Sequence, residues 1–245
     1  MKVAVCLSGQ PRWFKKAQPF LKKNLIDKFD CDVFMHAWFD PKKVGENYSG
    51  AAWTRGKTDQ ILKNTDKHLI SKYKPKLSLI EPQHDYFPST RPINEYRCTT
   101  NGTSANIVFS MFYSMCKSFE LREQYENENN FKYDVVVRLR YDYVVLETPD
   151  FDLDFDNKVY HTMSPESAYP EKICDWFIYG DSSTMSTVSK IFANLDEYHD
   201  KGVGVDGENM LMHHLQVNNI EWEGLHQKGF LVRDSDLSIR KWGWG

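Results

Sequence analysis

The sequence has few cysteines and no long hydrophobic run. Its five cysteines are an odd number, stand far apart and form no CxxC pair. This distribution argues against a disulfide framework or a zinc knuckle, and it favours a reducing compartment. No apolar stretch approaches the roughly 18 residues of a membrane-spanning helix. The start, MKVAVCLSGQ, is too short and too polar for a signal peptide. We therefore expect a cytoplasmic chain without stable membrane insertion.

A strong excess of either charge is also missing. The net charge is −3 over 245 residues, so no global basic field attracts nucleic acid or an anionic membrane. A nucleic-acid partner is possible but not favoured. Apolar residues make up 41% of the chain, which is typical of a globular protein, and the length suits one domain.

The N-terminal pattern predicts a strand, a helix and a second strand. A short apolar run, Lys2–Leu7, is broken by the sequence SGQPR, and Trp13–Lys28 carries apolar residues at helical spacing. Cys31–Trp38 has the composition of another strand. This order is typical of a parallel sheet with helices on its faces.

The same criteria predict further elements along the chain. Strands are expected at Leu77–Glu81, Val159–Met163 and Trp176–Gly180, and helices at Gln60–Tyr73, Ser104–Glu126, Ser182–Leu195 and Glu208–Val217. Pro82–Gly102 has no clear period, and such long irregular segments are often functional. We predict one α/β domain over residues 1–245, with a central, mostly parallel sheet flanked by helices.

One predicted strand carries charges where apolar residues are expected. In YDVVVRLRYDYVVLETPD, from Tyr133 to Asp150, the side chains of Arg138, Arg140 and Asp142 share one face because strand residues alternate. Unpaired buried charge is costly, so these groups form a structural salt-bridge cluster or open onto a polar cleft. Clefts in α/β sheets lie at the carboxyl ends of strands, and Asp142 is near that end.

Several motifs, in this order, resemble those of GT-A-type glycosyltransferases that use nucleotide sugars. They are VCLSGQPR, DVFMHAW, SMFYSMCKSFEL followed by YDVVVRLRYDYVV, DWFIYGDSSTM and VDGENMLMHHL. The chain is especially similar to small glycosyltransferases of large DNA viruses, phages and bacterial surface-polysaccharide clusters. The resemblance covers nearly the whole chain and implies a GT-A-like, Rossmann-related fold. For a viral protein, the location would be the host cytoplasm.

The resemblance implies a divalent metal, Mn²⁺ or Mg²⁺, at the end of the charged strand. Asp142 takes the position of the family's metal-binding DxD motif, although only one aspartate is present, and His226 is a candidate to complete the metal shell. One carboxylate can hold such an ion if diphosphate oxygens and water supply the other ligands. If the metal is dispensable, Arg138 or Arg140 would neutralise the diphosphate directly.

The resemblance also implies a donor-binding loop after the first strand. Ser8, Gly9, Gln10 and Arg12 match the place where the family holds the nucleotide, and an ordinary strand-to-helix turn is the alternative. His36 is a candidate for the nucleotide pocket or, equally, a core histidine. Stacking on base or sugar is a possible role for three tryptophans, although most tryptophans lie in cores: Trp38, Trp53 and Trp176.

Three acidic residues are the candidates for catalysis. Glu208 first, and Asp206 second, match the acidic motif from which inverting members draw the catalytic base. Both also favour the start of a helix through its dipole. Asp175 matches a residue that contacts acceptor or donor sugar, and a turn cap is its alternative. We assign nucleotide binding to residues 1–145 and acceptor binding to residues 146–245.

The predicted function is therefore transfer of a sugar from a nucleoside-diphosphate sugar to an acceptor hydroxyl. We expect an inverting, metal-assisted reaction with a glycan acceptor. One alternative is glycosylation of a modified base in viral DNA, and another is a non-catalytic nucleotide- or sugar-binding module. Nucleotidyl transfer is disfavoured because SGQPR lacks the glycine-rich GxGxR-type loop.

Overall fold

A seven-stranded sheet organises the protein. The computed structural model describes residues 1–48, 59–83, 92–99, 104–162 and 173–232. The strand order is β3-β2-β1-β4-β7-β6-β8, and only β7 runs antiparallel to its neighbours. The strands are β1 (Val3–Gly9), β2 (Asp32–Trp38), β3 (Leu77–Glu81), β4 (Val135–Arg140), β6 (Lys158–Thr162), β7 (Phe177–Gly180) and β8 (Glu221–Leu225). The predicted α/β fold with a mostly parallel sheet is confirmed.

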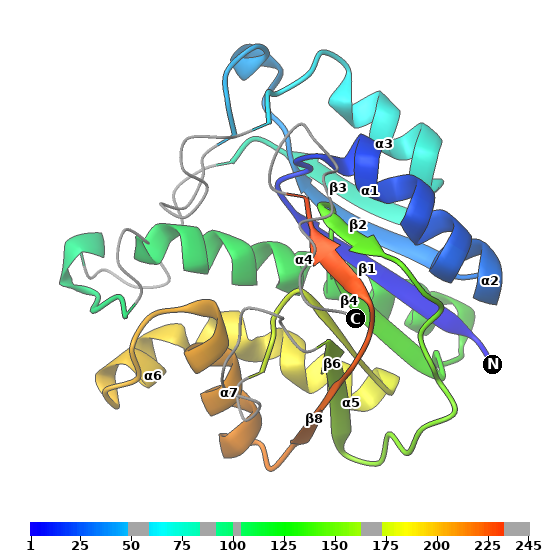
Figure 1. The fold of residues 1–245 in the computed structure, drawn as a ribbon. Coiled ribbons are helices and arrows are strands. Elements are labelled where there is room, and N and C mark those ends of the chain that lie inside the picture. Colours follow the sequence, from blue (N-terminus) through cyan, green and yellow to red (C-terminus); the bar gives the residue numbers. More distant parts are fainter. Residues whose placement is uncertain (49–58, 84–91, 100–103, 163–172, 233–245) are drawn as a thin grey trace.

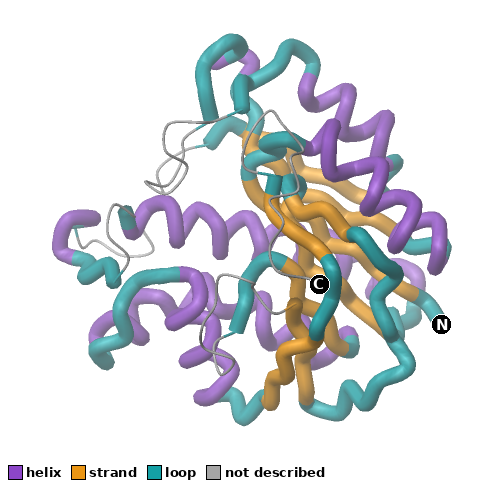
Figure 2. The backbone as a smooth tube through the Cα atoms, viewed as in Figure 1, coloured by secondary structure: helices purple, strands orange, loops and turns teal. Residues whose placement is uncertain are grey.

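Helices cover both faces of this sheet (Figure 1, Figure 2). They are α1 (Phe14–Leu21), α2 (Asp27–Phe29), α3 (Thr65–Tyr73), α4 (Ala105–Asn129), α5 (Ser182–Ser189), α6 (Leu195–Asp200) and α7 (Gly207–Val217). Helices α1 and α3 pack on one face, against apolar side chains of β1, β2 and β4. Helices α4 to α7 pack on the other. Because both faces are covered, the central strands are apolar almost throughout.

The predicted helices and strands occur at or near their expected places, with several differences. The helix expected over 13–28 divides into α1, a π-helical turn at Lys22–Ile26 and α2. The charged stretch is not one strand: β4 ends at Arg140, Tyr141 and Asp142 form a turn, and β5 (Tyr143–Val145) begins a second, two-stranded sheet with β9 (Gly229–Leu231). The helix expected over Ser182–Leu195 divides into α5, a 3-10 turn and α6. Much of the irregular segment after β3, at 84–91 and 100–102, lies outside the described residues.

The carboxyl ends of β1 to β4 meet at one edge of the sheet, because these four strands are parallel. Since β7 is antiparallel, its start at Phe177 lies at the same edge. The chain leaves β1 at Gly9, whose φ of 110° is a conformation that favours glycine. Both sequence halves, 1–145 and 146–245, therefore contribute strands to one sheet.

Among the described helices, none has the length and apolarity to cross a membrane.

A buried ionic network ties α4 to α5. The Arg122 guanidinium, fully buried, donates to Glu126 at 2.8 Å and to the Ser182 hydroxyl at 2.6 Å. Glu126, 1% exposed, also accepts from the Ser182 hydroxyl and from the backbone N–H of Tyr133, just before β4. Buried charges are tolerated when they are paired and hydrogen-bonded in this way, so the network fixes α5 against α4.

Gly229 allows β9 to pass close to β5. A Cβ atom at this position would lie 2.5 Å from Cζ of Tyr143 and 2.7 Å from the Val144 carbonyl oxygen. Tyr143 is fully buried and donates to the Thr162 hydroxyl, so its ring cannot move aside.

Gly229→Ala is expected to lower the free energy of unfolding by about 1–3 kcal/mol, measured by urea denaturation. Lys228→Ala, at an exposed neighbour, should change it by less than about 0.5 kcal/mol; an equal effect of both variants would contradict the steric explanation.

Candidate functional site

Three arginines gather at the carboxyl ends of β1 and β4. The parallel register pairs Cys6 with Arg138 and Ser8 with Arg140, so these four side chains lie on the α4 face of the sheet. Arg138 is 2% exposed and Ser8 is 3% exposed. Neither Nε and Nη1 of Arg138 nor Oγ of Ser8 has a hydrogen-bond partner among the described residues. Because buried donors are normally paired, these atoms mark a site where a ligand would supply acceptors.

The carboxylate of Asp142 lies between two of the arginines. Nε and Nη2 of Arg140 donate to its two oxygens, each at 2.9 Å, and Nη2 of Arg12 lies 3.6 Å from Oδ2. Asp142 is 4% exposed. Burial would raise the pKa of this carboxyl, but Arg140 and Arg12 outweigh that effect and lower it. Asp142 is therefore ionised at neutral pH and forms a two-point ion pair with Arg140.

Arg138 has a different environment from Arg140. Burial lowers the pKa of Arg138 to about 10, an effect that the nearby carboxylate of Asp175 opposes and the charge of Arg140 reinforces. At neutral pH the guanidinium therefore keeps its charge. Nε and Nη1 of Arg138 are buried and meet no hydrogen-bond acceptor among the residues that the structure describes, whereas Nε and Nη2 of Arg140 donate to Asp142.

The acidic candidates divide between the cluster and the start of α7. Oδ2 of Asp175, which is 8% exposed, lies against Gly207: a Cβ atom there would be 3.2 Å away. Asp206 caps α7, because Oδ1 accepts from the backbone N–H of Asn209 and Oδ2 from the Asn209 amide, each at 2.6 Å. The sequence alternative for this carboxylate was a favourable interaction with the helix dipole, and the structure places it at that helix N-terminus as a cap. Glu208, half-buried, follows in the first turn of the helix.

The donor loop and the histidine on β2 differ in their contacts. Gln10 donates to the Gln83 side chain at 2.6 Å, which links the loop after β1 to the residues after β3. Gln83 was not among the candidates predicted from the sequence, although a polar residue just after the end of a parallel strand indicates a possible site residue. His36 is fully buried between Ser114 of α4 and Glu81 of β3, so it is a core histidine and the nucleotide-pocket expectation is corrected.

The tryptophan candidates give little support for stacking on a ligand. Trp38 is 2% exposed and stacks on Tyr113 of α4, so its ring belongs to the core. Trp176 is partly buried and packs beside the apolar cluster under α1 and α3. Trp53 lies outside the described residues.

The metal expected at Asp142 does not fit the residues around it. Both carboxylate oxygens already accept from Arg140, and a second guanidinium is close. His226 is not brought to this place. The backbone carbonyl of Asp142 accepts from the backbone N–H of Val232, whereas His226 precedes Gln227, whose amide donates to the carbonyl of Glu147 beyond the far end of β5. Within the described ranges, no group of three or more His, Cys, Asp or Glu side chains could hold a metal ion.

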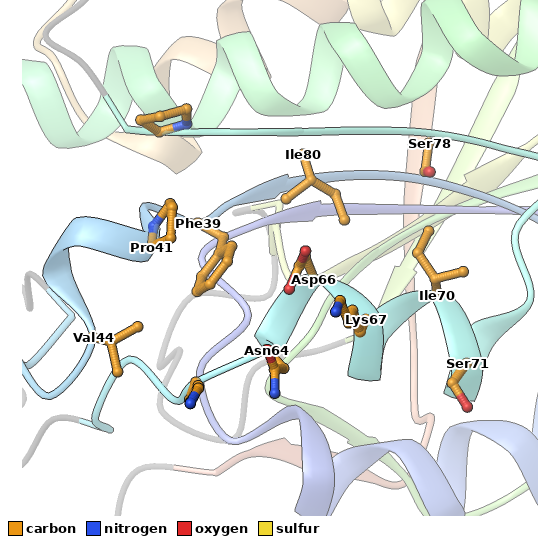
Figure 3. A pocket seen from close by; sticks show the side chains of 12 residues that line it. Phe39, Pro41, Val44, Asn64, Asp66, Lys67, Ile70, Ser71, Ser78 and Ile80 are labelled. Atoms are coloured by element: carbon orange, nitrogen blue, oxygen red, sulfur yellow. The ribbon is translucent and has the colours of Figure 1, made fainter.

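An open groove of about 890 Å³ lies away from the arginine cluster, between α3 and the edge strand β3. Figure 3 shows Phe39, Ile70 and Ile80 around it, together with Asp66 and Lys67 at the start of α3. None of the sequence-predicted site residues lines this groove. It therefore does not add to the candidate site.

Comparisons with known proteins found similarity to solved structures only. No protein-family profile and no curated protein sequence matches the chain. An active-site mutant of LgtC aligns with 91% of this chain and 72% of its own, at 7% identity and a TM-score of 0.49. The galactosyltransferase LgtC in complex with donor and acceptor sugar analogues aligns with 91% of this chain and 73% of its own, at 8% identity and a TM-score of 0.45. The glycosyltransferase GlyE of Streptococcus pneumoniae TIGR4 aligns with 92% of this chain at 10% identity and a TM-score of 0.41. The alignment covers 46% of GlyE, so the chain spans less than half of that protein.

Proposed function

We propose that the protein is a glycosyltransferase that moves a sugar from a nucleoside-diphosphate sugar to a hydroxyl of a glycan acceptor. The observation that carries the proposal is the buried arginine cluster at the carboxyl ends of β1 and β4, with open donors on Arg138 and Ser8. Ligands of α/β sheets bind at this edge, and guanidinium groups suit the oxygens of a diphosphate. The order of the sequence motifs supports the same family of reactions.

In the proposed reaction, the bond between the anomeric carbon and the diphosphate oxygen breaks as the acceptor oxygen attacks that carbon. The leaving diphosphate takes the bonding electron pair, and Arg138, Arg140 and Arg12 stabilise the charge that develops on it. The acceptor hydroxyl gives its proton to a carboxylate, for which we propose Glu208 in the first turn of α7. An attack from the opposite face inverts the anomeric centre.

The two halves of the sequence divide these roles. Residues 1–145 supply the arginines and the loop after β1, and residues 146–245 supply Glu208 and Asp175. Asp175 lies beside the start of α7 and within electrostatic range of Arg138. From that position we propose that it contacts the transferred sugar or the acceptor. Asp206 keeps its capping role and takes no part in proton transfer.

A donor and acceptor screen tests this function. The purified chain is incubated with UDP-, GDP-, ADP- and TDP-sugars and a set of oligosaccharides, with either MnCl₂ or EDTA present. Release of nucleoside diphosphate together with a saccharide heavier by one sugar, seen by mass spectrometry, supports the proposal. Transfer only to hydroxymethylated DNA would identify the modified-base alternative. Donor binding without any transfer or hydrolysis would contradict the proposal and leave a binding module.

A further inference from the structure

We infer that Asp142 is a positioning residue for two arginines, and that this chain binds the donor diphosphate without a divalent cation. The inference rests on the proposed function, because it concerns the same donor site. It differs from the metal role that the sequence resemblance implies for Asp142.

The oxygens of Asp142 are both engaged by Arg140. Nε donates to Oδ1 and Nη2 to Oδ2, each at 2.9 Å, in the parallel two-point geometry that arginine and carboxylate groups favour. Arg140 and Asp142 are two residues apart, at the end of β4 and in the turn that follows it. The turn therefore directs the carboxylate back onto the guanidinium, and the ion pair fixes the orientation of Arg140.

The positive charge of the guanidinium groups around the Asp142 carboxylate opposes the binding of a divalent metal ion there. In addition to the two bonds from Arg140, Nη2 of Arg12 lies 3.6 Å from Oδ2. Mn²⁺ or Mg²⁺ would have to approach between two guanidinium groups and displace a hydrogen bond from Asp142. With Asp142 only 4% exposed, little water reaches the carboxylate to complete an octahedral shell. The described residues supply no group of three candidate ligands elsewhere.

The same cluster already provides what an anion needs. Three guanidinium groups, those of Arg12, Arg138 and Arg140, lie around the carboxylates of Asp142 and Asp175, and Arg12 is also within electrostatic range of Asp59. Nε and Nη1 of Arg138 and the Ser8 hydroxyl are buried, and in the described part of the chain they have no hydrogen-bond partner. Fixed donors of this kind bind phosphate oxygens directly. Asp142 then serves to hold Arg140 and Arg12 in place before the diphosphate arrives.

The test measures binding of inorganic pyrophosphate, UDP, GDP and ADP by titration calorimetry, in EDTA and in MnCl₂. For the wild type, we expect at least one of these ligands to bind in EDTA with a Kd within about threefold of its value in MnCl₂. Electron paramagnetic resonance of added Mn²⁺ should show no uptake by the free chain. Tenfold or weaker binding in EDTA, binding of no ligand in EDTA, or Mn²⁺ uptake that D142N removes would each overturn the inference.

Two substitutions at Asp142 separate positioning from metal binding. Asp142→Asn keeps one acceptor oxygen for Arg140 but replaces the other by an NH2 donor, so affinity should weaken by less than in Asp142→Ala and by the same factor, within about threefold, in EDTA and in MnCl₂. Asp142→Ala removes the hold on Arg140 and should weaken binding about tenfold in both buffers. A loss of diphosphate affinity in the Asp142→Asn variant that appears only in MnCl₂ would contradict the positioning role of Asp142. If Asp142→Ala fails to fold, the asparagine variant and the wild-type comparison still decide.

The outcome is distinguishable from failure of the proposed function. If pyrophosphate or a nucleoside diphosphate binds equally well in EDTA and in MnCl₂ but the chain transfers no sugar, the arginine site is supported and the glycosyltransferase function is refuted. Sugar transfer that stops in EDTA and recovers with Mn²⁺, together with Mn²⁺-dependent binding, supports the enzyme and refutes the inference.

Discussion

Glu208→Gln is expected to lower kcat for sugar transfer by at least about a hundredfold, the lower range of what a general base contributes. The variant keeps the size of the side chain and its place in the first turn of α7, but it cannot accept the acceptor proton. The KM for the donor should stay within about threefold, because the arginine cluster that we propose to bind diphosphate is unchanged. Steady-state kinetics with the donor and acceptor from the screen measure both constants.

Asp206→Asn is the matched control for this prediction. Asparagine is as good an N-cap as aspartate, so the bond from the backbone N–H of Asn209 can be kept while the charge is removed. We expect kcat to remain within about threefold of the wild type. A large loss in Asp206→Asn together with near-normal activity in Glu208→Gln would assign the base to Asp206 and refute the capping role as its whole function.

Glu126→Ala is expected to lower the free energy of unfolding by about 3–5 kcal/mol, the cost of removing one partner of a buried ion pair. Arg122 is fully buried and would lose the carboxylate at 2.8 Å, while the N–H of Tyr133 and the Ser182 hydroxyl would lose their acceptor. Urea denaturation followed by circular dichroism measures the change.

Glu123→Ala provides the comparison, because Glu123 pairs with the same arginine from a position that is 33% exposed. Its removal should lower the free energy of unfolding by less than about 1 kcal/mol, as for other surface pairs. Equal losses for the two variants would show that the buried network is not what holds α5 on α4. Replacing Arg122 and Glu126 together by apolar residues should recover part of the loss.

The same carboxylate gives a pH dependence of stability. Burial would raise the pKa of Glu126, but the hydrogen bonds from Ser182 and Tyr133 and the charge of Arg122 outweigh it and lower the pKa. A carboxyl whose pKa is lower in the folded state stabilises the fold above its unfolded pKa, and that contribution is lost as the pH falls through the folded value. Denaturation midpoints measured from neutral to acidic pH should fall less steeply in Glu126→Gln than in the wild type.

Local sequence patterns predicted most of the secondary structure and the strand end at which the arginines gather. The spacing of Val108, Phe112, Met115 and Phe119 defines the buried face of α4, since helical periodicity is a property of the segment itself. The alternation of Arg138 and Arg140 with apolar residues, at a strand end of a parallel sheet, indicated a polar cleft there. These features depend on residues a few positions apart, so the sequence alone was enough to find them.

Other features depend on partners distant in the chain, which local patterns do not specify. The antiparallel insertion of β7 brings Asp175 to the carboxyl edge, and the pairing of β5 with β9 separates His226 from Asp142. The turn after Arg140 aims Asp142 at a guanidinium rather than into an open metal site. Strand register and turn geometry bring together side chains that are far apart in sequence. For that reason, composition and periodicity indicated where charge would gather, but the folded chain decided which charges would pair.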